Sequence, residues 1–208
     1  MLRLEDEGPY GNDETRSFVL SHFSSLCVRQ MKCVICECKL AIYDKFPLLD
    51  GTLFVSPIKY SDLNDSTDEQ GPSAGGEGVE RTESESKLMV PALISNKNQY
   101  IYAICLSCLH SRNEHEIKCK FCKQPWKGGS TLQIGTMYKF EIFSAFPCCQ
   151  KKLNCSKCDF QIVNLNATGG LQYFSSYSEE RECVKCKTKH FHFIKPLSKF
   201  YDTTKSKV

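Results

Sequence analysis

The stretch that decides the fold is Cys105-Leu-Ser-Cys108-Leu-His-Ser-Arg-Asn-Glu-His-Glu-Ile-Lys-Cys119-Lys-Phe-Cys122. It contains two CxxC pairs, in which two residues separate the cysteines. A CxxC turn presents two sulfur atoms to one metal ion from a single bend, and its backbone amides can donate hydrogen bonds to those sulfurs. The stretch therefore predicts a fold held by metal ions rather than by a large apolar core.

The same spacing recurs on both sides of this stretch. Ten of the 14 cysteines form five CxxC pairs, and an adjacent pair of cysteines stands where a sixth would be expected. A repeated two-residue spacing is not a feature of disulfide frameworks, so we expect these cysteines to be free thiols in a protein of a reducing compartment. Six pairs supply ligands for three structural zinc ions per chain. The predicted ligands are Cys33, Cys36, Cys105, Cys108, Cys119, Cys122, Cys148, Cys149, Cys155, Cys158, Cys183 and Cys186.

Spacing also suggests which pairs share a metal. Between Cys122 and Cys148 lie 25 residues, and between Cys158 and Cys183 lie 24, as if a zinc ribbon were used twice in succession. We therefore expect consecutive pairs to share a zinc. The alternative is a cross-braced arrangement, which joins the first pair to the third and the second pair to Cys148 and Cys149.

The adjacent Cys148 and Cys149 are unusual ligands, because neighbouring residues reach one metal only with an awkward local backbone. The sequence leaves open a site that uses one of them and is completed by His110, His115 or another group. Cys38, two residues beyond the first pair, is expected to be a spare thiol.

Apolar residues recur at helical spacing from Asp13, an expected N-cap, to about Gln30. Val19, Phe23 and Leu26 lie on the expected buried stripe with Leu20 beside them, and Cys27 on the same stripe is expected to be a small buried side chain.

Between the first two pairs, Asp50-Gly51 separates two apolar runs within residues 45–56 and predicts a β-hairpin. The following residues, 61–87, are acidic and glycine-containing with no aromatic side chain, which predicts a disordered loop inserted into the first metal module.

The rest of the chain predicts β-ribbons: alternating Tyr138, Phe140 and Ile142, a hairpin over 160–174, and a strand over 190–195. The fold class is a small zinc-stabilised α+β protein, with an N-terminal helix and a treble-clef-like module followed by two zinc-ribbon-like β modules. The expected units are a flexible acidic N-terminus (1–12), the helix with the first zinc module (13–117), a second zinc ribbon (118–154), a third zinc ribbon (155–200) and a flexible tail (201–208).

No motif in the sequence indicates catalysis. A catalytic zinc needs three protein ligands and an open position, yet there is no HExxH helix, phosphate-binding loop or GxSxG elbow. The longest nearly apolar run, 100–109, is half the length of a membrane span. We therefore expect a soluble, monomeric, non-enzymatic protein without a small-molecule substrate, located in the cytoplasm with the nucleus as an additional site.

Charge and aromatic residues suggest where a partner binds. Residues 1–117 carry 11 basic and 18 acidic side chains, whereas residues 118–208 carry 16 and 6. Each zinc held by four thiolates adds a net charge of about −2, so the C-terminal part stays basic, but less so. Aromatic residues are frequent interface anchors, and lysines beside them are typical of RNA-binding surfaces. The candidate partner-binding residues are Trp126, Tyr173, Phe174, Tyr177, Lys185, Lys187 and Lys189.

Several unusual strings together resemble the C-terminal cysteine-rich region of the Headcase family over residues 13–200. They are Phe46-Pro-Leu-Leu-Asp-Gly-Thr-Leu-Phe-Val-Ser-Pro57, Tyr102-Ala-Ile-Cys-Leu-Ser-Cys108, Leu132-Gln-Ile-Gly-Thr-Met-Tyr138, Pro147-Cys-Cys-Gln-Lys-Lys-Leu-Asn-Cys155 and Leu171-Gln-Tyr-Phe-Ser-Ser-Tyr177.

The resemblance implies a non-enzymatic regulator of growth and development that binds the zinc-finger RNA-binding protein Unkempt and is linked to TOR growth signalling. Any association with RNA would then be indirect.

Direct RNA binding by the lysine-rich C-terminal part is the alternative function. A RING-type ubiquitin-ligase module is a weaker one, because ten residues separate Cys108 from Cys119 where a RING has two or three.

Overall fold

The computed structural model describes residues 13–43, 50–63, 87–110, 116–166, 171 and 173–203. Several predictions concern residues outside these ranges: the flexible N-terminus at 1–12, most of the acidic loop within 61–87, the first arm of the hairpin within 45–49, the turn of the hairpin over 160–174, and residues 204–208 of the predicted tail. The first and last residues of the acidic segment, 61–63 and 87, are described, and they pack or pair with the folded part of the chain. Leu63 is buried, and Lys87 exchanges backbone hydrogen bonds with Gln30 and Lys32.

The N-terminal helix α1 spans Asp13–Ser25 and ends before the expected position near residue 30. Val19 and Phe23 are buried, in agreement with the helical spacing, but Leu26 and Cys27, which follow the helix, are exposed. The helix stops because Cys27 has φ of 54°, in the left-handed region that commonly terminates helices. The prediction that Cys27 is a buried hydrophobe is therefore wrong.

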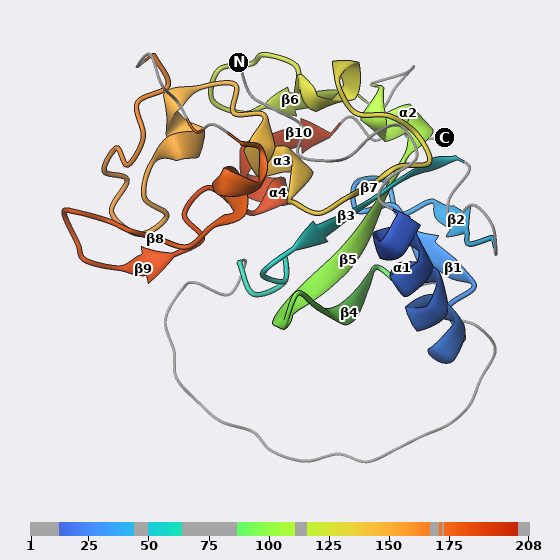
Figure 1. Ribbon diagram of the computed structural model, residues 1–208. Coiled ribbons are helices and arrows are strands. Elements are labelled where there is room, and N and C mark those ends of the chain that lie inside the picture. The colour runs from blue at the N-terminus through green and yellow to red at the C-terminus, as the bar shows by residue number, and fades with distance from the viewer. Residues whose placement is uncertain are drawn as a thin grey trace, which may run out of the picture.

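A four-stranded sheet forms the centre of the molecule (Figure 1). Its strands, in spatial order, are β4 (Met89–Ile94), β5 (Lys97–Cys105), β3 (Gly51–Ser56) and β7 (Met137–Tyr138). β5 pairs antiparallel with β4 and β3, and β3 pairs parallel with β7. All six residues of β3 are buried, because this strand has a neighbour on each edge. The register places Gly51 opposite Cys105, which brings the end of β5 next to the start of β3.

β4 and β5 form an antiparallel hairpin in the sheet. The second arm of the hairpin predicted around Asp50-Gly51 is β3, which pairs with β5 and β7, and the first arm lies outside the described residues. The β4–β5 turn has Ser95 and Asn96 at φ of 51° and 58°, the two positive angles of a type I′ turn. Pro91 lies within β4, although proline has no amide hydrogen to donate and is rare in central strands. It is tolerated here because β4 is an edge strand.

The other elements are short and connect the cysteine pairs. Two of the three small ribbons lie at opposite ends of the molecule, β1–β2 beside α1 and β8–β9 on the far side of the sheet (Figure 1). The ribbons are β1 (Gln30–Lys32) with β2 (Lys39–Ala41), β6 (Ile117–Cys119) with β10 (Tyr201–Thr203), and β8 (Arg181–Glu182) with β9 (Lys189–His190). The short helices are α2 (Leu106–Leu109), η1 (Gly128–Ser130), α3 (Ile142–Ala145), η2 (Gln150–Leu153), η3 (Ser175–Ser178) and α4 (Leu197–Phe200).

The strand predicted through Ile142 is interrupted, because this residue begins α3. The buried carboxylate of Glu141 accepts hydrogen bonds from the amides of Phe143 and Ser144, which caps the helix and turns the chain out of the β conformation.

Three predictions for the C-terminal part differ from the described structure. The described residues of 160–174 contain no strand, although an isolated bridge joins Asn154 to Gln161. Residues 201–203 are not a flexible tail but form β10, with Tyr201 opposite Cys119 on β6. In the 190–195 segment only His190 belongs to a strand.

Most buried apolar side chains form one core. It joins α1, the sheet, α3 and β10, and includes Phe23, Phe54, Tyr102 and Phe140. A smaller, separate cluster contains Leu153, Tyr177 and Phe193, with Ile162, Val163 and Leu171 packed against it. The protein is a small α+β fold, and the assignment of its modules as treble clef or zinc ribbon stays a prediction.

Candidate metal centres

Four of the CxxC pairs form the same backbone turn, which we call a knuckle. The amide of the residue after the second cysteine donates to the carbonyl of the first, at 2.8–3.1 Å in the four knuckles. The amide of the first cysteine donates to the carbonyl five residues later, at 2.8–3.0 Å. The residue after the second cysteine has φ near 60° in every case: Glu37, Lys123, Asp159 and Lys187. The knuckles are Cys33–Cys36, Cys119–Cys122, Cys155–Cys158 and Cys183–Cys186.

The fifth pair is built on a helix instead. Cys105 ends β5 and is the N-cap of α2, where its sulfur accepts the amide hydrogen of Cys108 at 3.4 Å. A cysteine at this position satisfies one of the free amides of the first helical turn, as a serine cap would.

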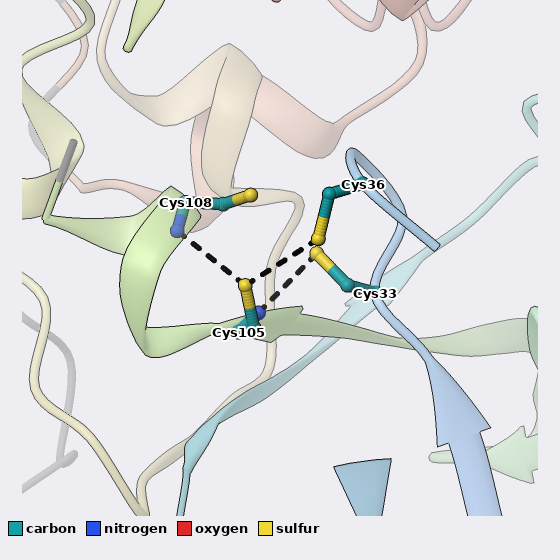
Figure 2. A group of neighbouring side chains, drawn as sticks. All are labelled: Cys33, Cys36, Cys105 and Cys108. Atoms are coloured by element: carbon teal, nitrogen blue, oxygen red, sulfur yellow. Dashed lines mark hydrogen bonds between the residues drawn. The ribbon is translucent and has the colours of Figure 1, made fainter. Parts of the chain in front are cut away.

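The first cysteine group contains Cys33, Cys36, Cys105 and Cys108, whose sulfur atoms all lie within 4.8 Å of one another (Figure 2). The sulfur of Cys36 lies 3.7 Å from that of Cys105, and the amide of Cys105 donates to the sulfur of Cys33 at 3.3 Å. The knuckle between β1 and β2 therefore faces the end of β5 and the start of α2.

In the first group the four thiols compete for ionisation. Hydrogen bonds from the thiols of Cys105 and Cys108 lower the pKa of Cys33. The pKa of Cys108 is raised, chiefly by its hydrogen bonds to Cys105 and Cys33 and then by burial. A divalent cation removes this conflict, because it stabilises all four thiolates together.

The second group contains Cys119 and Cys122, from the knuckle after β6, with Cys148 and Cys149 from the segment between α3 and η2. The sulfur of Cys122 lies 3.5 Å from that of Cys148, and the sulfur of Cys119 lies 3.9 Å from that of Cys149. Both adjacent cysteines thus join one group.

Of the two histidines considered for the second group, His110 does not join it. The Nδ1 of His110 lies 2.8 Å from the carbonyl oxygen of Gly129, and His115 lies outside the described residues.

A buried lysine adds positive charge beside the second group. The Nζ of Lys152 lies 3.4 Å from the ring centroid of Tyr201 and 4.8 Å from that of Phe200. Burial lowers the pKa of this ammonium, and the thiol groups of Cys119 and Cys148 oppose the shift. Burial raises the pKa of Cys119, but the amides of Cys122 and Phe121 outweigh it and lower that pKa to about 7. Burial is the main cause that raises the pKa values of Cys148 and Cys149 in the same group. A bound cation would favour the thiolate form of these two residues as well.

The third group contains Cys155 and Cys158 from one knuckle and Cys183 and Cys186 from the knuckle between β8 and β9. The sulfur of Cys155 lies 3.7 Å from that of Cys186, and the sulfur of Cys158 lies 3.6 Å from that of Cys183. Hydrogen bonds from the side chain and amide of Thr188 lower the pKa of Cys186 to about 6.

A histidine that sequence reasoning missed holds the two knuckles of the third group together. His192 is buried, with Nδ1 against the amide and hydroxyl of Ser156 and Nε2 against the carbonyl of Thr188. In the sequence His192 alternates with phenylalanines, which suggests one face of a strand. This pattern does not predict the contact between His192 and the two knuckles.

The structure does not offer the predicted aromatic anchors to a partner. Trp126, Phe174 and Tyr177 are buried, and Tyr173 is half-buried. Trp126 packs at 4.8 Å from the ring of Phe143, so it completes the core rather than a surface. Phe174 and Tyr177 were expected on a ribbon, but they lie at the start of η3 and within it.

Other side chains stand at the surface instead. Lys185, Lys187 and Lys189 are exposed, although Lys187 lies 3.8 Å from Glu182 and Lys189 lies 3.3 Å from Glu180. The exposed large apolar residues include Phe121 and Val184, each between the two cysteines of a knuckle. Their position in the sequence could have predicted this exposure, because the two residues between the cysteines of a CxxC turn point away from the metal.

Among the described residues, no helix is long and apolar enough to cross a membrane. The fold and these sites define a small α+β protein with three groups of four cysteines, each able to hold one metal ion. The thiol donors, their spacing and the amides that face them fit a tetrahedral thiolate-bound ion.

Comparison with known sequences identifies the family. The sequence model of the Headcase protein matches residues 1–73 and 80–197, and the chain belongs to the Headcase family. It is 34% identical to the Headcase protein of Drosophila melanogaster, over 98% of this chain and 16% of the fly protein. It is 34% identical to the Headcase protein homolog of Homo sapiens, over 96% of this chain and 32% of the human protein. The chain thus spans a third or less of the curated relatives it matches, and no solved structure matches it.

Proposed function

We propose that this chain is a non-enzymatic, zinc-binding adaptor of the Headcase type that regulates growth and development. It would bind an Unkempt-like zinc-finger RNA-binding protein and contribute to TOR growth signalling. The observation that carries the proposal is the arrangement of twelve cysteine sulfurs in three groups of four. Membership of the Headcase family supports the biological role.

Zinc is the metal that best suits these sites. Four thiolates in tetrahedral arrangement are typical of structural zinc, and four cysteine ligands leave no open position for a substrate or an activated water. We infer that the three ions replace part of the apolar core and hold the short ribbons rigid, and that they perform no catalysis.

A rigid body with exposed side chains at its knuckles suits an adaptor. Phe121 and Val184 are 49% and 67% exposed, and neither is needed to fill the core. We place this activity in the cytoplasm, with the nucleus as an additional location, and take the chain to act as a monomer.

Direct RNA binding is the second candidate function, favoured by the exposed Lys185, Lys187 and Lys189 around the last knuckle. The nearby Glu180 and Glu182 weaken the positive field that an RNA backbone needs. A RING module is disfavoured, because a RING needs the cross-braced pairing whereas these sulfurs are grouped sequentially.

The test is a binding assay between the purified, zinc-loaded chain and an Unkempt-like protein, with and without ribonuclease. The matched variant is K185E/K187E/K189E, which reverses the charge of three exposed lysines away from the apolar core. We expect binding to survive both ribonuclease and the charge reversal.

The opposite result distinguishes the candidates. Binding that disappears with ribonuclease and in the charge-reversed variant would assign the function to RNA. Absence of binding under every condition would overturn the adaptor proposal for this part of the protein.

A further inference from the structure

The first cysteine group has a fifth thiol beside it. Cys38 lies two residues after Cys36 and is exposed, and its carbonyl oxygen accepts the amide hydrogen of Cys33 at 2.9 Å. This backbone bond holds Cys38 against the knuckle. Hydrogen bonding with the thiol of Cys33, then burial, then hydrogen bonding with Cys36 raise the pKa of the Cys38 thiol.

The other knuckles show where a side chain at this position points. Because the four knuckles share one hydrogen-bond pattern, the residues equivalent to Cys38 are Gln124, Phe160 and Thr188. In the last knuckle the hydroxyl of Thr188 lies 3.4 Å from the sulfur of Cys186, the second cysteine of its pair. A side chain at this position therefore reaches the sulfur of the second cysteine, and only in the first knuckle is it a thiol.

The position that Cys38 approaches is the least buried of the first group. Cys33, Cys105 and Cys108 are buried, whereas Cys36 is half-buried and lies on the loop between β1 and β2 (Figure 2). The three buried sulfurs come from the core-facing side of the group. The outer sulfur is the one that can be exchanged without moving the sheet.

We propose that Cys38 is an alternative metal ligand that exchanges with Cys36, so that the first centre has two coordination states. When Cys38 binds the metal, its thiol proton passes to the released thiolate of Cys36. The number of bound thiolates and the net charge of the site stay the same, and no oxidant or reductant takes part. The exchange rests on the proposed occupancy of the group by zinc.

The consequence is a metal centre that tolerates loss or modification of one outer cysteine. In either state one thiol remains at the surface next to the bound metal, in the loop that connects β1 to β2. The second and third groups have no such reserve, because Gln124, Phe160 and Thr188 offer no thiol.

The test counts zinc and free thiols per chain by elemental and mass analysis after dialysis of folded, reduced protein. The variants are C36S, C38S and C36S/C38S, with C122S and C186S as matched controls in the other groups. We expect three zinc ions in C36S and C38S, and two in C36S/C38S, C122S and C186S. Cobalt-substituted C36S should keep the absorption of a four-thiolate site.

A transplant keeps the test independent of the folding of the first module. In C122S/Q124C and C186S/T188C the new thiol occupies the equivalent position, and each should bind one more zinc than its parent. Loss of zinc from C36S equal to that from C122S, or no rescue by either transplant, would overturn the exchange. Fewer than three zinc ions in the unmodified chain would instead contradict the proposed zinc occupancy itself.

Discussion

The imidazole Nε2 of His192 lies 3.0 Å from the carbonyl oxygen of Thr188, the residue whose side chain faces the sulfur of Cys186. The other ring nitrogen lies 3.0 Å from the hydroxyl oxygen of Ser156, in the opposite knuckle of the third group. One buried ring thus spans both knuckles. The third group depends on this contact because β8 and β9, each of two residues, provide little sheet pairing of their own.

Replacement of His192 by alanine should loosen the third group alone. Loss of a buried hydrogen-bonded side chain typically costs about 1–3 kcal/mol, and here it removes the contacts of the ring with Thr188 and Ser156. We expect one of three zinc ions to become more accessible to a competing chelator. The matched control is H190A, since His190 contacts neither knuckle through a hydrogen bond in the described structure. Equal zinc release from both variants would contradict the bracing role.

Removal of the metal should unfold the protein. Structural zinc contributes apparent binding free energies of about 10–16 kcal/mol per site in small domains, and that energy is coupled to folding. The ribbons that carry the cysteines are too short to persist without it. We expect a strong chelator at neutral pH to abolish the near-ultraviolet circular dichroism and the cooperative thermal transition, and added zinc to restore both. A chelated chain that kept its transition would refute the structural role.

Stability should rise at alkaline pH because of Lys195. Burial lowers the pKa of this ammonium to about 8, against the opposing influence of Asp159 and Cys155. Between about pH 8 and the usual lysine pKa of 10.5, the unfolded chain binds more protons than the folded one, so the free energy of unfolding increases with pH. One pKa unit corresponds to about 1.4 kcal/mol, so the gain is on the order of 3 kcal/mol.

The measurement is urea unfolding of zinc-loaded protein between pH 7.5 and 10 (roughly the window in which Lys195 titrates). Lys195→Met should remove the increase, whereas Lys199→Met, an exposed lysine nearby, should keep it. An unchanged slope in the Lys195 variant would assign the pH dependence to other groups.

Gly129 should not tolerate a side chain. A Cβ at this position would lie 1.9 Å from the carbonyl oxygen of Leu109, a backbone atom at the end of α2. Since backbone cannot move aside as a flexible side chain can, we expect Gly129→Ala to destabilise the protein by about 1–3 kcal/mol or more. Denaturant midpoints check this, with Thr131→Ala as an exposed control. A change below about 0.5 kcal/mol would show that the loop relaxes freely.

The local turns could be predicted from the sequence, and the longer elements only in part. The CxxC spacing indicates each knuckle because the turn closes within six residues, through bonds from Cys33 to Cys38 and their equivalents. The helix at Val19 and Phe23 follows from its periodicity. The strand after Asp50 is present, but its partners are β5 and β7, whose pairing depends on residues about 50 and 85 positions away.

The sequence by itself determined the number and type of candidate metal ligands and the family to which the chain belongs, because cysteine pairs and turn residues are local features. Only the tertiary structure decided that Cys148 and Cys149 share one group, that Trp126 is buried and that residues 201–203 form a strand. It also decided that Cys38 stands beside the first group. These features depend on how segments distant in the sequence pack against a common core. Such long-range packing cannot be predicted from any run of neighbouring residues.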